Sequence, residues 1–132
     1  MVLRIIPDVV NDQTIYSLHA SSTVQEAAEE MVTHNISAIV VVGDDYEMVG
    51  IVTERDMTRR VVARNLDAKQ TKLEAIMSAE PEILSPDDLA HEALARMLQW
   101  EFRHLPVVEK NRVVGMVSMR VLQKAIATSL FA

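Results

Sequence analysis

The stretch Val49-Gly50-Ile51-Val52-Thr53-Glu54-Arg55 has a counterpart in Val114-Gly115-Met116-Val117-Ser118-Met119-Arg120. In both, an apolar run that contains one glycine ends in a hydroxyl residue, and a helical pattern follows. The chain has only three glycines, and two of them occupy these matched places. The match points to an internal repeat, for which the flanking sequence provides a test.

Two further pairs of segments align in the same order. A shift of 66 residues places residues 25–31 on residues 91–97, and residues 39–42 on residues 105–108. The first pair has apolar residues at helical spacing, and the second pair is apolar throughout. Three matches in one order indicate a tandem duplication rather than coincidence.

Each copy predicts the element order β-α-β-β-α, and the fold class is therefore α+β. The segments of the first copy are a strand at 15–18, a helix from 24, strands at 38–42 and 48–53, and a helix at 55–63. Those of the second copy are a strand at 83–84, a helix at 89–100, strands at 105–108 and 113–118, and a helix from 120. A short helical turn is expected at 71–77, ahead of the second copy.

The size of each copy predicts how the two are combined. A unit of roughly 60 residues buries too little apolar surface to be stable alone. We therefore expect the two units to pack sheet to sheet with pseudo-twofold symmetry. The first unit, with the N-terminal segment and linker, is expected to cover residues 1–70, and the second residues 71–132.

Composition excludes several classes of function. With 132 residues, a net charge of -6 and no cysteine, the chain has no disulfide, thiolate nucleophile or Cys-ligated zinc, and its acidity argues against generic nucleic-acid binding. No apolar run approaches the roughly 20 residues that span a bilayer. Pro7 and Asp8 interrupt any secretory signal, so we expect a cytoplasmic protein. Phosphate-loop, nucleophile-elbow and paired-histidine motifs are missing, and we expect no enzymatic activity.

The repeated pattern resembles the cystathionine-β-synthase (CBS) domain in the tandem pair called a Bateman module. Gly50-Ile51-Val52-Thr53-Glu54-Arg55-Asp56 matches that family's Gly-x-x-Thr/Ser-x-x-Asp motif. The second copy contributes residues 103–108 and 115–118, and Ile76-Met77 resembles the lead-in that precedes many CBS copies. The resemblance covers nearly the whole chain. It implies a non-enzymatic regulatory module that binds AMP, ADP or ATP, or in some members S-adenosylmethionine, in the clefts between the two sheets.

The resemblance also implies which residues contact the ligand. Thr53 and Ser118 stand where a hydroxyl meets a phosphate at a helix start, and Asp56 where a carboxylate accepts both ribose hydroxyls. Val121 replaces that carboxylate in the second copy, so we expect one competent site and a weak or empty second one. Further contacts to the nucleotide are expected from Tyr16, Ser17, Leu18, Ile36, Ser37, Ala38, Arg55, Arg103 and His104.

Structural alternatives stand beside these roles. Asp56 also suits the first turn of a helix, and Leu18 and Ile36 also suit an apolar core. Residues 55, 59, 60 and 64 form a basic cluster that faces either a polyphosphate or the chain's own carboxylates. At the level of the whole chain, the alternatives are a structural or interaction module with vestigial clefts, and a nucleic-acid binder. The resemblance further implies a flat homodimer that uses the helices after the hairpins, and a signal received by a separate effector protein.

Overall fold

The computed structural model describes residues 2–130, which divide into two compact units. The N-terminal unit comprises residues 16–81, and in the C-terminal unit the residues up to 15 join those from 82 onward. This division differs from the one at 70/71 that the repeat suggests. The reason is packing, because Ile5 belongs to the apolar core of the C-terminal unit, whereas Leu73 and Ile76 belong to the core of the N-terminal unit.

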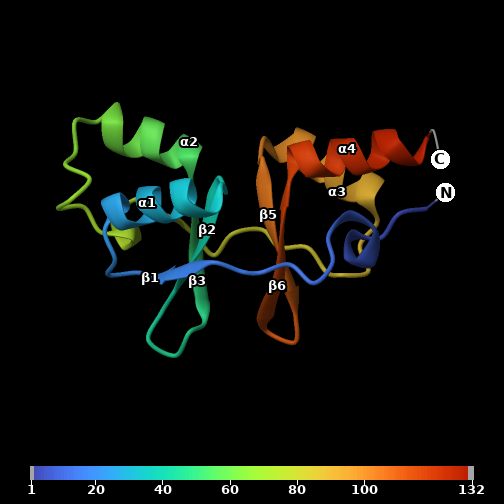
Figure 1. Cartoon of the computed structure of the whole chain (residues 1–132), viewed down its shortest axis with the longest axis horizontal. Coiled ribbons are helices and arrows are strands. Elements are labelled where there is room, and N and C mark those ends of the chain that lie inside the picture. The colour runs from blue at the N-terminus through green and yellow to red at the C-terminus, as the bar shows by residue number, and fades with distance from the viewer. Residues whose placement is uncertain (1, 131–132) are drawn as a thin grey trace. The chain divides into compact units, whose positions relative to one another are not determined.

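The N-terminal unit has a four-stranded sheet in the order β1-β2-β3-β4. Strand β1 is parallel to β2, while β3 and β4 are added antiparallel (Figure 1). A parallel pair needs a crossover, which helix α1 supplies between β1 and β2. The bounds are β1 Ser17–His19, α1 Val24–His34, β2 Ala38–Val42, β3 Met48–Thr53, α2 Glu54–Asp56 and β4 Ser78–Ala79. A π-helical stretch, Met57–Val62, continues α2 directly.

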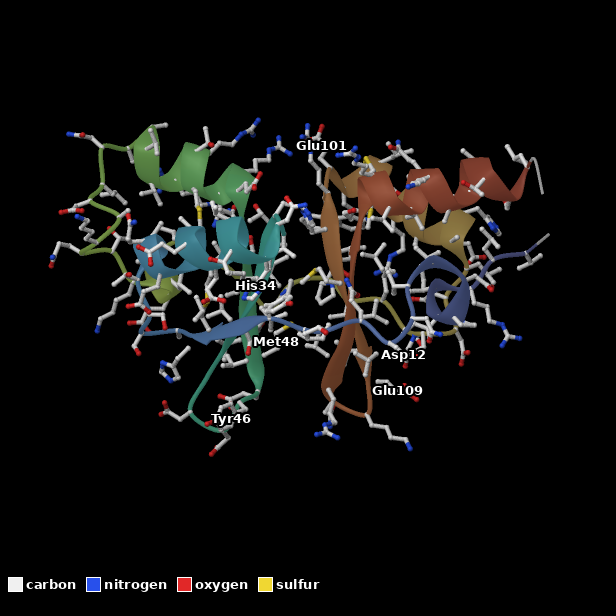
Figure 2. The ribbon with its side chains drawn as sticks, in the orientation of Figure 1. Asp12, His34, Tyr46, Met48, Glu101 and Glu109 are labelled. Carbon is white, nitrogen blue, oxygen red and sulfur yellow. The ribbon has the colours of Figure 1, made fainter. Side chains whose placement is uncertain are left out.

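Helix α1 is capped by Thr23, whose hydroxyl accepts a hydrogen bond from Glu26 N at 3.2 Å. A threonine hydroxyl is a common cap for the first N–H groups of a helix. The apolar stripe of α1 is buried against strand β2, all five residues of which are themselves buried. The strand is β-branched throughout except for Ala38, as expected for a strand inside a core. The β2–β3 hairpin turns at residues 43–47, and Tyr46 is exposed there at its tip (Figure 2).

The C-terminal unit repeats the order with fewer paired strands. Strands β5 and β6 form an antiparallel hairpin between helices α3 and α4. The expected strand at 83–84 is reduced to a single parallel bridge between Leu84 and Val107. The bounds are α3 Ala90–Trp100, β5 His104–Glu109, β6 Arg112–Ser118 and α4 Met119–Ser129.

The two units agree in the way their first helices end. Asn35 and Glu101, at matched positions, both have left-handed backbone conformations, with φ of 51° and 60°. The residue after each donates its N–H back into the helix, Ile36 to Met31 O at 3.0 Å and Phe102 to Met97 O at 3.1 Å. This return bond is typical of a helix that ends with a left-handed residue. The duplication predicted from sequence therefore extends to the helix ends, and the α+β fold of two β-α-β-β-α units is confirmed.

The matched glycines lie where another segment crosses the outer edge of a hairpin. Gly50 pairs with Ala79 of β4, and a Cβ on Gly50 would lie 2.7 Å from Ser78 O. Beside Gly115 the crossing segment comes from the N-terminus, where the Gln13 amide both donates to Met116 O at 3.1 Å and accepts from Met116 N at 2.8 Å. Neither partner was predicted from sequence.

The expected helical turn before the second copy is present at Leu73–Ala75.

Candidate functional site

The candidate residues of the N-terminal unit converge on the start of strand β2. Ala38, the first residue of β2, pairs with Thr53 at the end of β3, and Ser17 of β1 pairs with Val40. Two backbone hydrogen bonds close the group, from Val40 N to Tyr16 O at 3.2 Å and from Glu54 N to Ser37 O at 3.0 Å. Residues 16–18, 36–38 and 53–56 are thus brought together by strand register.

Thr53 and Asp56 form a reciprocal cap at the start of α2. Asp56 N donates to Thr53 Oγ1 at 3.2 Å, and Thr53 N donates to Asp56 Oδ2 at 2.9 Å. This capping box satisfies two N–H groups that the helix start would otherwise leave unpaired. It also leaves the Thr53 hydroxyl proton free, since within residues 2–130 that hydroxyl donates to no protein acceptor.

The Asp56 carboxylate is held from two sides and is largely shielded. Its side chain is 15% exposed, and Oδ1 lies 3.6 Å from Arg60 Nε. An ionised carboxylate offers about four lone-pair positions. Thr53 N occupies one of them, and the Arg60 contact at 3.6 Å is an ion pair rather than a hydrogen bond, so the group can still accept the two hydrogen bonds that a vicinal diol donates.

The remaining candidates form an apolar and aromatic surround. Ala38 is buried, and Leu18 and Ile36 are half-buried against the core, as the structural alternative for these two side chains predicted. Tyr16 stacks on His34, with ring centroids 3.9 Å apart and an interplanar angle of 20°. His34, at the end of α1 (Figure 2), was not a candidate from sequence, because no pattern links a helix end to a strand so distant along the chain.

The four arginines of the basic cluster differ in exposure and in their contacts. Arg60 pairs with Asp56 and donates to main-chain oxygens, so this member of the cluster faces a carboxylate of the chain itself. Arg55, in the first turn of α2, is half-buried, while Arg59 and Arg64 are exposed. Arg55 is therefore the cluster member placed beside Thr53 at the helix start.

The C-terminal unit has the same strand pairing and hydroxyl cap at the end of its hairpin, but it lacks the carboxylate. His104 pairs with Ser118, and Met119 N donates to Arg103 O at 2.8 Å, as Glu54 N does to Ser37 O. Ser118 Oγ accepts from Val121 N at 3.1 Å, so the hydroxyl cap is retained. Val121 cannot return the bond, and 42% of its surface is exposed. Arg103 contributes a positive charge at this end of the hairpin, but position 121 offers no carboxylate to accept from a diol.

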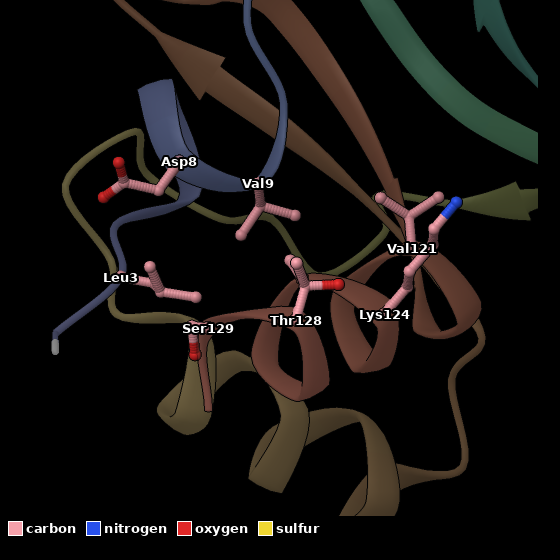
Figure 3. A pocket seen from close by; sticks show the side chains of 8 residues that line it. Leu3, Asp8, Val9, Val121, Lys124, Thr128 and Ser129 are labelled. Atoms are coloured by element: carbon pink, nitrogen blue, oxygen red, sulfur yellow. The ribbon is translucent and has the colours of Figure 1, made fainter. Parts of the chain in front are cut away.

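A pocket of about 360 Å³ lies in the C-terminal unit between the N-terminal segment and α4 (Figure 3). Apolar side chains dominate its wall, with charge only at Asp8 and Lys124, and Val121 at one end. It had no sequence signal, because the segments that line it lie at opposite ends of the chain. Its lining residues are Leu3, Asp8, Val9, Val121, Lys124, Ala125, Thr128 and Ser129.

Residues 2–130 provide neither a metal centre nor a membrane-spanning helix. The described residues contain no group of three or more His, Asp or Glu side chains placed to hold a metal ion. Among the same residues, every helix is too short or too polar to cross a bilayer.

Comparison with known families settles what this architecture is. The CBS domain model matches twice, over residues 5–63 and 73–128. The chain belongs to the CBS-domain family. The tandem pair inferred from the repeat is thereby confirmed, and so is the resemblance carried by the two Gly-containing motifs.

Relatives of this CBS pair range from single modules to much longer proteins. The CBS domain-containing protein CBSCBSPB1 of Arabidopsis thaliana is 33% identical over 82% of this chain, but the match spans only 20% of that protein. Among solved structures, a protein with CBS domains from Burkholderia ambifaria has a TM-score of 0.83 and 34% identity, covering 89% of this chain and 85% of that one. The CBS domain pair of protein MJ0100, solved with 5-methylthioadenosine and S-adenosyl-L-methionine, has a TM-score of 0.85 at 22% identity, covering 98% of this chain and 99% of that one. At that identity the likeness is one of fold.

Proposed function

We propose that this CBS pair is a non-enzymatic regulatory module whose N-terminal unit binds an adenine nucleotide, AMP, ADP or ATP, at the start of β2. The observation that carries the proposal is the Asp56 carboxylate, 15% exposed and fixed by Thr53 N and Arg60 beside an unused hydroxyl. A carboxylate fixed in advance loses little conformational entropy when it accepts a ribose diol.

The remaining contacts follow from the chemistry of a nucleotide. The Thr53 O–H donates to a phosphate oxygen, and Arg55 adds positive charge at the same helix start. Adenine lies on the apolar side chains of residues 36 and 38, with Leu18 of β1 and Tyr16, which precedes that strand, at its edge. Support comes from the MJ0100 complex, since both of its ligands contain adenine and a ribose diol.

S-adenosylmethionine is the second candidate, favoured by its presence on MJ0100. It shares the adenosine part with AMP but has a sulfonium and an amino acid group where AMP has phosphate. The contacts to Asp56 are the same for both ligands, so Thr53 and Arg55 distinguish them. A phosphate gains from both residues, whereas a sulfonium is repelled by the guanidinium.

The competing proposal is an interaction module with vestigial clefts. It is supported by the capping box, which accounts for Thr53 and Asp56 as a helix start, and by the core packing of Leu18 and Ile36. The exposed Trp100 and Phe102 on the C-terminal unit suit the same alternative.

Titration calorimetry with AMP, ADP, ATP and S-adenosylmethionine separates these proposals. We expect one nucleotide per chain, and a loss of affinity of about 10-fold or more in Asp56→Ala, the cost of unpaired ribose hydroxyls. Asp45→Asn, on the exposed hairpin turn, is the control and leaves binding unchanged. If none of the four ligands gives a heat of binding, nucleotide sensing is refuted and the interaction module is favoured.

We also propose that the module forms a homodimer through the helices that follow the hairpins, and that its effector is a separate protein. Exposed apolar side chains on these helices support this, Val62 at 74% and Val121 at 42%. Light scattering should give twice the chain mass, and Val62→Glu should reduce it to that of one chain. A monomeric wild-type chain at high concentration refutes the dimer.

A further inference from the structure

Arg60 contacts two parts of the N-terminal unit that are far apart in sequence. Its Nε lies 3.6 Å from Asp56 Oδ1. Its Nη1 donates to Ile76 O at 3.0 Å and to Met77 O at 3.3 Å. A guanidinium is suited to such a role because its five N–H donors are held in one rigid plane. Arg60 therefore bridges the Asp56 carboxylate and the main chain of residues 76 and 77.

The main chain that Arg60 contacts leads directly into β4. Ser78 and Ala79 pair with Ile51 and Gly50 of β3, and the absent Cβ of Gly50 permits this close approach. Ile76 is 3% exposed, so the segment is anchored in the core at the first of the two carbonyls that accept from Arg60. Beyond residue 81 the chain enters the C-terminal unit.

We propose that Arg60 is a positioning residue that couples the Asp56 carboxylate to the main chain of residues 76–79. Ligand binding at Asp56 and the conformation of this segment then affect each other, since coupling between two sites is reciprocal. The inference rests on the proposed function for its ligand, but the coupling itself exists without ligand. It assigns to Arg60 the regulation of the site rather than contact with the nucleotide.

The ligand-free test is hydrogen exchange of the peptide spanning residues 73–81 in the full chain. Asp56→Asn keeps an acceptor for Thr53 N but removes the charge that holds Arg60. We expect exchange of this peptide to rise about 1.5- to 5-fold in Asp56→Asn, as the worth of such an ion pair implies, and at least as much in Arg60→Gln. Arg59→Gln, an exposed neighbour on the same helix, should leave it unchanged.

Exchange of residues 38–42 monitors the core, and it should be equal in all four proteins. Faster exchange in 73–81 with an unchanged core supports the coupling. An Asp56→Asn protein whose 73–81 peptide exchanges at the wild-type rate overturns it, whatever the ligand does.

The ligand arm uses AMP and its 2′,3′-dideoxy analogue, which lacks the diol. AMP should slow exchange of residues 73–81 in the wild type, the dideoxy analogue should not, and AMP bound to Arg60→Gln should not. If AMP slows exchange of residues 73–81 equally in the wild type and in Arg60→Gln, the proposed coupling through Arg60 is wrong. Failure of AMP, ADP and ATP alike to bind the wild type overturns the proposed function instead, and the ligand-free comparison still decides the coupling.

Discussion

The two matched glycines give a paired test of how segments cross the hairpin edges. A Cβ on Gly50 would lie 2.7 Å from both Ser78 O and Met77 Sδ. The methionine side chain can move aside, but the Ser78 carbonyl belongs to β4, which pairs with β3. At Gly115 the nearest atoms lie at 3.3 Å and all belong to side chains. Both glycines have backbone conformations open to alanine, because neither has a positive φ.

The magnitudes follow from these distances. Overpacking against atoms that cannot yield costs about 1–3 kcal/mol, and alanine recovers about 0.4–1 kcal/mol by restricting the unfolded chain. We therefore expect Gly50→Ala to lower the free energy of unfolding by about 1–2 kcal/mol. Gly115→Ala should change it by less than about 0.5 kcal/mol, because its small strain and the entropic gain nearly cancel.

Urea titration followed by circular dichroism measures both values, and thermal melting should show a fall of roughly 4–10 °C for Gly50→Ala. Hydrogen exchange at residues 78–81 should rise in Gly50→Ala alone. Equal losses in the two variants, or a stable Gly50→Ala, would contradict the claim that β4 is fixed by main-chain contact while the Gln13 crossing adapts.

Four further substitutions test the helix ends. Thr53→Ala should cost about 0.5–2 kcal/mol in urea titration, and Ser118→Ala less, because only Thr53 takes part in a reciprocal cap. Val121→Asp should complete the cap of α4 and, in calorimetry, raise the stoichiometry of AMP from one to two per chain. A stoichiometry that stays at one means that the carboxylate is not what the C-terminal unit lacks. Glu101→Gly should raise the melting temperature, because Gly avoids the roughly 1–2 kcal/mol that a left-handed conformation costs other residues.

The sequence predicted the elements well because each depends on local pattern. Apolar periodicity predicted the matched helices α1 and α3, and the β-branched runs predicted the strands of the two hairpins. The edge partners were not predictable, because Gln13 and Ser78 belong to short polar segments without periodicity. The strand expected at 83–84 is a single bridge in the structure. Two residues are too few to show the alternation of polar and apolar side chains by which a strand is recognised in sequence.

The candidate site was predictable in its motif but not in its surroundings. The motif spacing was enough to place Thr53 beside Asp56, because both lie within one helical turn. The stacking of Tyr16 on His34 depends on how α1 lies against β1, and the Arg60 contacts on where the chain passes after residue 75. Such contacts between distant segments require the folded backbone, and no spacing rule encodes them.

Comparison of the two helix starts bears on why Asp56 is present at all. Helix α4 extends over eleven residues, Met119–Ser129, with Ser118 as its cap and no carboxylate in its first turn. A hydroxyl alone therefore suffices to begin a helix in this frame. The carboxylate of Asp56 exceeds that requirement, and it is shielded to 15% exposure and fixed by an arginine that the cap does not need. The reciprocal cap and the ion pair account for where this carboxylate is held, and its remaining capacity to accept hydrogen bonds is what the ligand proposed for the N-terminal unit would use.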